Sequence, residues 1–487
     1  MNFFFCAVLF SFSSPVGHPV PQDVPVVEAP RVAVTPLARD YSQAYLDRMG
    51  QAAFEAVRSV EPTKLKSLRF KFVERSEMQK VLYEELRPQM DCQFEDAEMA
   101  EANAQTMATT LAGAVLAKFA TGSGDVLVVH DNIFDIAELL HMPDLASTEV
   151  LSAVLCHEAA HAVDHHRHPL PGLFGRVTDT DHLQAINAVI EGHAQHVARK
   201  ACKKIDNMVG FDLFTASIDH LPEADDAHQA YLSRIVVAQF SFAYKDGERF
   251  IDAMALEGGA SAIEKVFQTP PTESILITEP SWYLKPKSRP KVPYDLEQAL
   301  QRYEASLHKE DPDHWMMTKV ELLAPQISAA FSLLPKDRYE QSVKDILECR
   351  VLVAQNLDGE GSMISAGLFA LSTVPQAKQF LELENDLIAI KPEKLKENIT
   401  ITIDKTEKLT KKDSTQFEGI WIEQTIIYGA TPIKNHSLLA HRGQIVAELN
   451  FSNVGITKKE AIKSAETLLQ APTKTPEEKA SSEKATK

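Results

Sequence analysis

The sequence predicts an α+β protein in which a mainly helical domain with a small sheet precedes a smaller α+β module. Helical periodicity of apolar residues dominates 41–257, short runs rich in valine or isoleucine interrupt it, and a proline- and lysine-rich stretch at 285–293 separates two patterns. We therefore expect a first domain at 38–290, an accessory module at 295–470 and a disordered tail at 471–487.

The bulk composition is that of a globular protein with a sizeable core. The chain has 487 residues, of which 44% are hydrophobic and 24% charged. Its formal net charge of −18 argues against nucleic acid or an anionic membrane surface as the main partner, because both repel an acidic surface.

The N-terminal segment resembles a secretory leader. Phe3 to Phe10 is apolar but too short to span a bilayer, and Ser11-Phe12-Ser13 is similar to a small-x-small cleavage site. We expect residues 1–37 to form this leader and an extended lead-in. The protein is then exported to a periplasmic or extracellular location, without stable membrane insertion. The leader lacks a positively charged start, so a cytoplasmic protein is the alternative.

The first elements follow from their side-chain patterns. Segments 41–60 and 77–86 have helical apolar spacing, and 95–119 is alanine-rich and almost free of helix breakers. Residues 68–73 alternate apolar and polar side chains as a half-buried strand does, and the valines of 125–131 follow a glycine turn, which indicates a second strand. We expect this second strand to offer an edge to which an extended peptide could add.

The next helix is predicted at 147–167, capped by Ser147 or Thr148, and a loop at 170–177 separates it from a helix at 181–204. Further helices and strands are predicted from the same periodicity of apolar residues. They are helices at 228–244, 247–257, 295–308, 313–334, 374–388 and 457–469, strands at 349–353 and 399–403, and a hairpin at 436–451.

The first of these two helices carries the motif His157-Glu158-Ala-Ala-His161. On a helix the two histidines lie one turn apart on one face, with Glu158 beside them. This arrangement is typical of a zinc site in which two imidazoles bind the ion and the carboxylate acts on a water molecule. A hydrolytic zinc site usually takes three protein ligands, so a third is required.

A third histidine in the HExxHxxGxxH pattern does not fit. That pattern needs glycine at Asp164 and histidine at Arg167, and the neighbouring His166 and His168 are each one residue out of register. These cationic residues are expected at the solvated end of the helix, where the helix dipole favours positive charge.

Acidic candidates follow on the next helix. Asp179 and Asp181 lie where a helix starts, so capping accounts for them. Glu191 is flanked by apolar and small residues inside the helix, and a buried carboxylate there needs a partner, which a cation would supply.

Four neighbouring residues are assigned structural roles. His193 and His196 point away from Glu191 on a helical projection, towards solvent or a neighbouring helix. Gly192 would let two helix backbones come close. Cys156 projects about 100° from His157, so we expect a small buried residue and not a ligand.

The motif with a glutamate on a following helix resembles the gluzincin metallopeptidases of the thermolysin-like superfamily, over about residues 120–205. The resemblance implies a zincin-like domain with one zinc ion, held by His157, His161 and Glu191, with Glu158 as general base. In this chain the connection from His161 to Glu191 is longer than in the thermolysin pattern. Gln195 replaces the aspartate expected four residues after Glu191, and could still hydrogen-bond a ligand histidine.

Two further side-chain roles are predicted around the motif. Asp164 projects onto the histidine face and could orient an imidazole. A donor to the developing oxyanion is expected from a later helix; Tyr231, Tyr283 and His228 are alternatives to Tyr244, which ends a helix near a glycine turn and is preferred.

The sequence thus predicts zinc-dependent hydrolysis of peptide bonds in a peptide or protein substrate. Two alternatives stay open. The scaffold could be an inactive peptidase-like protein that binds or supports a partner through the C-terminal module, or the zinc site could hydrolyse a non-peptide amide.

Overall fold

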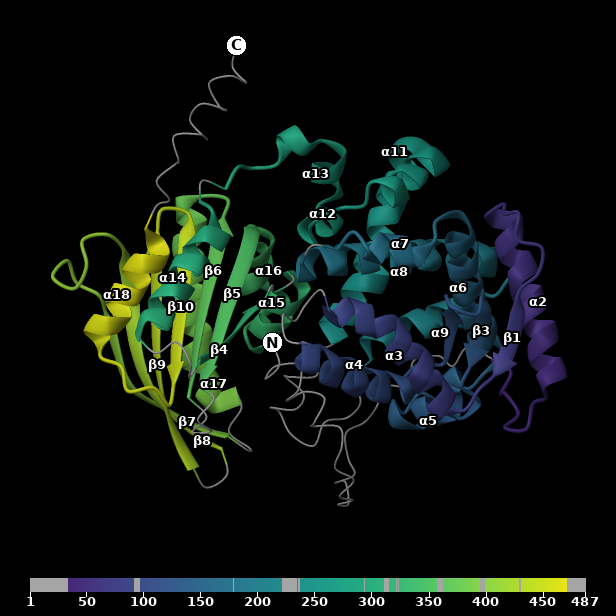
Figure 1. Cartoon of the computed structure of the whole chain (residues 1–487), viewed down its shortest axis with the longest axis horizontal. Coiled ribbons are helices and arrows are strands. Elements are labelled where there is room, and N and C mark those ends of the chain that lie inside the picture. The colour runs from purple at the N-terminus through teal and green to yellow at the C-terminus, as the bar shows by residue number, and fades with distance from the viewer. Residues whose placement is uncertain are drawn as a thin grey trace, which may run out of the picture. The chain divides into compact units, whose positions relative to one another are not determined.

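Figure 1 shows the computed structural model of the chain. It describes residues 34–91, 97–177, 179–220, 234, 237–292, 294–310, 315–320, 322, 324–356, 362–394, 399–428 and 431–470. The cleavage site and most of the leader, and the predicted tail at 471–487, lie outside the described residues.

The described residues form two compact units, and nearly all of those up to Ser288 belong to the first. The second begins at Arg289. Both contain helices and a sheet, so the α+β class is confirmed. In the described part of the chain, none of the helices combines the length and apolar composition that a bilayer crossing requires.

The first unit is mainly helical and has one small sheet (Figure 1). Its elements are α2 (Gln43–Val60), β1 (Arg69–Phe72), α3 (Arg75–Asp91), α4 (Ala97–Ala112), β2 (Ala117–Ala120), β3 (Asp125–Val128), α5 (His130–Leu139), η1 (Pro143–Leu145), α6 (Thr148–Arg167), α7 (Leu170–Phe174), α8 (Thr180–Lys204), α9 (Met208–Asp219), η2 (Phe242–Asp246), α11 (Gly247–Gln268), α12 (Ile275–Thr278), α13 (Pro280–Leu284) and η3 (Pro286–Ser288).

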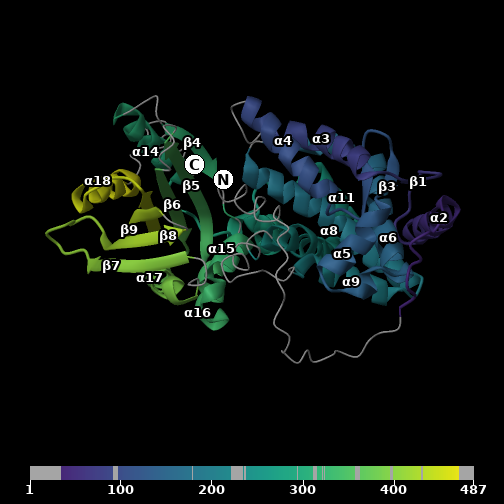
Figure 2. The ribbon, with the colours of Figure 1, turned by 90° about the horizontal axis from the view of Figure 1, so that it is seen from below.

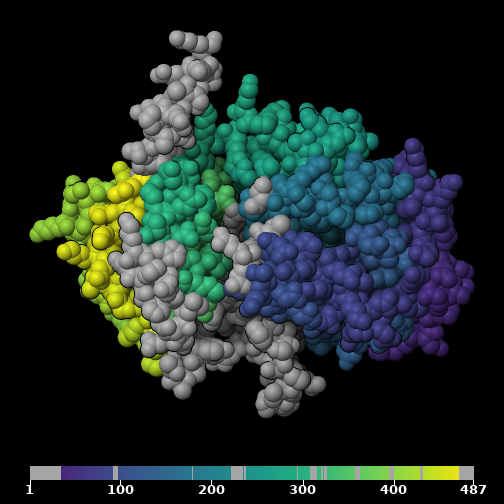
Figure 3. Space-filling view, in the orientation of Figure 1, coloured from purple at the N-terminus to yellow at the C-terminus, as the bar shows by residue number. Residues whose placement is uncertain are grey.

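Helix α6 is the centre of this unit. Its residues from Val150 to Asp164 are buried, with one exception, against α2, α8 and α9. The motif helix therefore has an apolar environment on nearly all sides, and its polar side chains must find partners inside the protein. Helices α3 and α4 pack on each other through the small side chains of Ala104 and Ala108, and their outer sides form part of the surface in Figure 3.

The small sheet has the order β1-β3-β2, with β1 parallel and β2 antiparallel to β3. The prediction that residues 125–131 form an edge strand is wrong, because β3 is paired on both sides. The edge strand on the α6 side is β2. The sequence predicted a helix over 95–119, so the start of this strand was assigned to the helix. The helix ends at Ala112, before Gly113, and valine, leucine and phenylalanine follow. These residues favour a strand.

Two further predictions need correction. Residues 170–177 contain the short helix α7 and are not all loop. The predicted helix 313–334 is interrupted, because β4 (Trp315–Val320) precedes a helix that starts at Ala324. Near the end of the predicted lead-in, Pro36 forms an isolated antiparallel bridge with Ser147, and the Leu37 amide donates to the Ala146 carbonyl at 2.9 Å.

The second unit is built on a seven-stranded antiparallel sheet with the order β4-β5-β6-β10-β9-β8-β7 (Figure 2). One face packs against α14 and α18, and the other against α15, α16 and α17. Its further elements are α14 (Leu296–Glu310), α15 (Ala324–Ala330), η4 (Phe331–Leu333), α16 (Lys336–Lys344), β5 (Ile346–Asn356), β6 (Met363–Leu371), α17 (Val374–Lys394), β7 (Ile399–Lys408), β8 (Glu418–Tyr428), β9 (Thr431–Arg442), β10 (Ile445–Ser452) and α18 (Lys458–Leu469).

The hairpin predicted at 436–451 is present as β9 and β10, joined by a turn in which Gly443 has a φ of 59°. Glycine suits this left-handed conformation because it lacks a Cβ. Helix α17 carries a buried polar side chain among the apolar residues that pack against the sheet. The Glu384 carboxylate is only 6% exposed and lies near Glu448 of β10.

We predict that Glu384 makes this unit less stable as the pH rises. Burial raises the pKa of Glu384 well above its usual range, and the charge of Glu448 adds to the effect. A carboxyl group with a raised pKa contributes stability below its unfolded-state pKa, and this contribution is lost as the pH rises through the folded-state pKa. Glu384→Gln should therefore be more stable than wild type at pH 8, by roughly 1–3 kcal/mol, the cost of an unpaired buried group.

The measurement is denaturant unfolding of the full chain at pH 5 and pH 8, followed by tryptophan fluorescence. Glu382→Gln is the control, because Glu382 is exposed on the same helix. Glu382→Gln should leave the pH dependence of the free energy of unfolding unchanged. If Glu384→Gln also left it unchanged, the buried carboxylate would not cause the loss of stability at high pH.

Candidate metal centre

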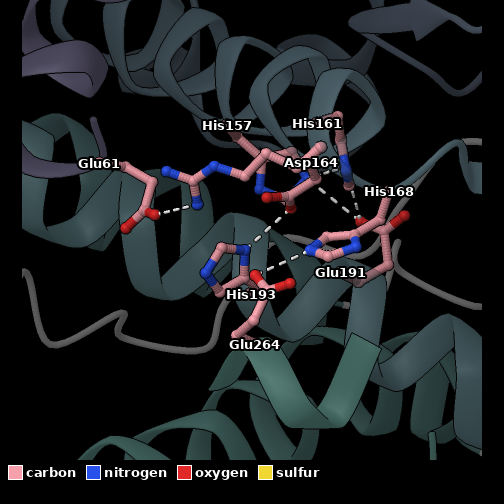
Figure 4. A network of polar contacts seen from close by, with 9 residues as sticks. Glu61, His157, His161, Asp164, His168, Glu191, His193 and Glu264 are labelled. Atoms are coloured by element: carbon pink, nitrogen blue, oxygen red, sulfur yellow. Dashed lines mark hydrogen bonds and ion pairs between the residues drawn. The ribbon is translucent and has the colours of Figure 1, made fainter. Parts of the chain in front are cut away.

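Three predicted ligands come together between α6 and α8. The His157 Nε2 atom lies 3.0 Å from His161 Nε2 and 3.1 Å from Glu191 Oε2, and His161 Nε2 lies 3.4 Å from the same oxygen (Figure 4). Among the described residues, they are the group of histidine, cysteine and acidic side chains that could hold a metal ion.

The separations fit a tetrahedral ion with one open position. For metal–ligand distances of about 2.0–2.1 Å, two ligand atoms of a tetrahedral zinc site lie about 3.3 Å apart. The three measured separations of 3.0–3.4 Å bracket this value. Two histidine nitrogens and one carboxylate oxygen are also one of the donor sets found in catalytic zinc sites.

Helix capping and helix packing explain why the ligands converge. The Ser147 side chain accepts from the Val150 amide at the start of α6, and Asp179 accepts from the His182 amide at the start of α8. Both caps were predicted. The four-residue spacing of the two histidines then presents both imidazoles to α8, which packs against α6.

The charges of the three groups are strongly coupled. Burial alone would raise the pKa of Glu191, but the neighbouring His161 charge and the contacts with both imidazoles hold that pKa well below its usual range. Burial would lower the pKa of His161, and the Glu191 carboxylate outweighs it and raises the pKa to about 9. The carboxylate is therefore anionic and suited to a cation.

Glu158 is held by the edge strand of the small sheet. Its Oε2 atom accepts a hydrogen bond from the Phe119 amide of β2 at 2.5 Å, and the side chain is 8% exposed. One carboxylate oxygen is thus fixed, and no hydrogen bond joins the other to the described residues. This contact could not be foreseen, because β2 was predicted to be helical. The β-type residues after Gly113 were the available signal.

Strand β2 is itself anchored to α3. Glu85 accepts hydrogen bonds from the Thr121 amide and hydroxyl, both at 2.8 Å, and forms an ion pair with Lys118 at 2.8 Å. These contacts fix the strand whose backbone positions Glu158.

Gln195 performs the role predicted for it. Its side-chain carbonyl accepts from His157 Nδ1 at 3.0 Å, and its amide group lies 3.4 Å from the Thr215 hydroxyl of α9. Since Nδ1 carries the proton, the Nε2 lone pair of His157 faces the other ligands. His161 has no equivalent support, because its buried Nδ1 atom has no partner among the described residues.

The role proposed for Asp164 is wrong. Its carboxylate pairs with His193 Nδ1 at 2.9 Å and does not orient a ligand imidazole (Figure 4). His193 and His196 are both buried against neighbouring helices, so the alternative that they face solvent is also wrong. The pairing gives the buried Asp164 carboxylate and the buried His193 imidazole a hydrogen-bond partner each, which explains why they meet.

Other residues near the site have structural roles. Cys156 is a buried free thiol in the core, as expected. Asp181 differs from the prediction, since Asp179 caps α8 and Asp181 accepts from the Ser274 amide at 3.0 Å. Gly192 does allow two backbones to come close, but the neighbour is not α6. A Cβ at Gly192 would lie 2.1 Å from the backbone of Gly247, at the start of α11.

Tyr244 is the oxyanion-donor candidate that the structure brings to the site. It lies in the π-helical segment η2, its ring stacks on His157 with centroids 5.4 Å apart, and its hydroxyl contacts Glu191. Burial and the charge of Glu191 raise the pKa of the phenol, so it stays protonated and can donate. Tyr283 instead donates to the Thr269 carbonyl, and Tyr231 and His228 lie outside the described residues.

Comparison of the chain with protein-family models, with curated proteins and with solved structures finds no match. The assignment of the site therefore depends on its own geometry and chemistry.

We predict that the metal-free protein loses stability between pH 6.5 and 9. The pKa of His161 is raised from 6.5 to about 9, so its protonated form stabilises the fold below pH 6.5, and this stabilisation is lost as the pH rises through 9. The free energy of unfolding should fall by about 3 kcal/mol across this range. Glu191→Gln removes the carboxylate responsible and should flatten the profile. Denaturant titrations in chelator measure both, and a flat wild-type profile would contradict the coupling.

Loss of the hydrogen bond to His157 should weaken metal binding. Gln195→Leu removes the acceptor that fixes the imidazole, and we expect zinc affinity to fall about 10–100-fold. Gln195→Glu keeps an acceptor there and should bind zinc at least as tightly as wild type. Competition with a chromophoric chelator measures both affinities. Wild-type affinity in Gln195→Leu would show that this contact does not support the site.

Proposed function

We propose that this chain is a zinc-dependent hydrolase of peptide bonds, similar to the gluzincin metallopeptidases. The observation that carries the proposal is the convergence of His157, His161 and Glu191 on one point, with the Glu158 carboxylate fixed beside them. The packing of two helices does not by itself require two imidazoles and an anionic carboxylate to meet at one point. The binding of a divalent cation does require such a group of ligands.

The side chains have distinct roles in the proposed reaction. A bound zinc ion would supply Lewis acidity, which lowers the pKa of a water ligand and polarises a carbonyl. The free carboxylate oxygen of Glu158 accepts a proton from the attacking water, and Glu158 later donates that proton to the leaving amine. The Tyr244 hydroxyl, next to Glu191, donates a hydrogen bond to the negative charge that develops on the carbonyl oxygen.

The edge strand supports a peptide as the substrate. Strand β2 pairs with β3 on one side, and the Phe119 amide points to the opposite side, where Glu158 lies. An extended peptide that adds to this edge brings its own backbone next to the catalytic carboxylate. A peptide bond is then the group closest to the reacting side chains.

Substitution of Glu158 tests the mechanism. Glu158→Gln keeps the shape and the contact with Phe119 but removes the base, so we expect it to retain one zinc ion per chain and to lose about 10²–10⁴-fold in kcat. Glu138→Gln is the control, since Glu138 is exposed on α5. The assay combines metal analysis with cleavage of a peptide library, and unimpaired cleavage by Glu158→Gln would refute the role of this residue.

The same assay separates the alternative functions. Stoichiometric zinc without cleavage of any peptide would favour hydrolysis of a non-peptide amide. A protein that takes up no zinc would favour a binding or structural role for the scaffold. Cleavage that requires zinc and Glu158 is the result that the proposal predicts.

A further inference from the structure

One face of α8 lies against the start of α11. The residues on this face recur every three or four positions, as one ridge of a helix does: Ala188, Gly192, His196 and Arg199. The opposing residues on α11 are Gly247, Glu248 and Asp252. This interface connects the helix that carries Glu191 to the helix that continues from Tyr244.

The first half of the interface is a contact between backbones. A Cβ on Gly247 would lie 2.1 Å from the Ala188 carbonyl oxygen, and a Cβ on Gly192 would lie 2.1 Å from the carbonyl carbon of Gly247. Glycines make this approach possible. They offer no side chains that interdigitate, however, so this contact does not define how far α11 is rotated or shifted along α8.

The second half is a cluster of charged hydrogen bonds. Arg199 donates from Nε to Glu248 at 2.6 Å and from Nη2 to both oxygens of Asp252 at 2.7 and 2.6 Å. His196 adds a contact from Nδ1 to Asp252 at 2.6 Å. The planar guanidinium fixes direction as well as distance, so these contacts, which we call the Arg199 clamp, set the position of α11 on α8.

Tyr244 depends on this position. It lies one helical turn before Glu248, and η2 runs directly into α11. Its ring must stay on His157, and its hydroxyl beside Glu191, to act on the substrate. A small shift of α11 relative to α8 would move the hydroxyl away from the ligands.

We propose that Arg199, through Glu248 and Asp252, is a positioning residue that holds Tyr244 against the ligand side chains. The effect on catalysis rests on the proposed function, whereas the position of the tyrosine ring does not. Arg199 contacts none of His157, His161 and Glu191 in the described structure, so its removal should leave zinc affinity unchanged.

The kinetic test is a double-mutant cycle on the zinc-loaded full chain. We expect Arg199→Gln to lower kcat about tenfold, because displacement of a reacting group by a fraction of an ångström is sufficient for such a loss. In a Tyr244→Phe background the same change should have little further effect, because the group on which Arg199 acts is gone. Additive effects of the two substitutions would overturn the proposal.

The control is Arg75→Gln. Arg75 also donates from Nε and Nη2, to Asn132 and Asp135, and is similarly exposed, but it is the first residue of α3 and its partners lie on α5. We expect its removal to leave kcat within twofold of wild type. Arg199→Lys keeps the charge and one hydrogen bond, so we expect it to retain part of the activity that Arg199→Gln loses. If Arg199→Gln does not fold, Arg199→Lys takes its place in the cycle.

A second measurement does not depend on catalysis. Because the Tyr244 ring stacks on His157, it shifts the NMR resonances of that imidazole, which can be observed in histidine-labelled protein. Arg199→Gln should change this shift, while Arg75→Gln and Tyr244→Phe should largely preserve it. If wild type cleaves no peptide and the shift still responds to Arg199, the proposed function fails and the positioning role stands. An unchanged shift in Arg199→Gln overturns the positioning role.

Discussion

The candidate metal centre depends on one constraint, the close packing of α6 against α8, which brings the Glu191 carboxylate within 3.4 Å of the two imidazoles of α6. In the absence of a cation this arrangement is sustained by a proton, because the pKa of His161 is raised to about 9 beside the anionic Glu191. A proton and a divalent cation would therefore compete for the same place. The two imidazoles are buried, with side chains 2% and 10% exposed, so water screens their interaction with Glu191 only weakly.

The side chains that support the ligands are distributed unevenly. His157 is fixed by Gln195 from α8, is covered by Tyr244 and has Phe214 of α9 at its edge. His161 lacks a partner for its second nitrogen in the described structure. The imidazole with more partners is the one that Tyr244 covers, and α8 supplies both its hydrogen-bond acceptor, Gln195, and the neighbouring Glu191 carboxylate.

The local parts of this site could be predicted from the sequence, and the long-range parts could not. Helical spacing alone places His157 and His161 on one face, and the apolar neighbours of Glu191 mark it as a carboxylate in need of a partner. The partner of Asp164 could not be predicted, because a helical projection relates only residues of one helix, and the partner, His193, lies on α8. The partner of Gly192 was likewise open, since a glycine indicates a close approach without naming the helix that approaches.

The fold shows the same division. Capped helices such as α6 and α8 and the glycine turn between β9 and β10 are encoded locally, and they were found. Strand β2 was missed, because its alanines follow an alanine-rich helix and its identity as a strand comes from pairing with β3. β4 was missed for a similar reason, since its pairing with β5 decides its conformation. The polar contacts of Glu158 and Tyr244 depend on such tertiary neighbours.

The most direct test of the central claim is zinc X-ray absorption spectroscopy on the full chain, compared with its Glu191→Ala variant. We expect one zinc ion per chain, with scattering from two imidazoles and from oxygen at about 2.0 Å, and loss of the bound ion in the variant. A protein that takes up no zinc, or one whose zinc has sulfur neighbours or is unaffected by the loss of Glu191, would contradict it.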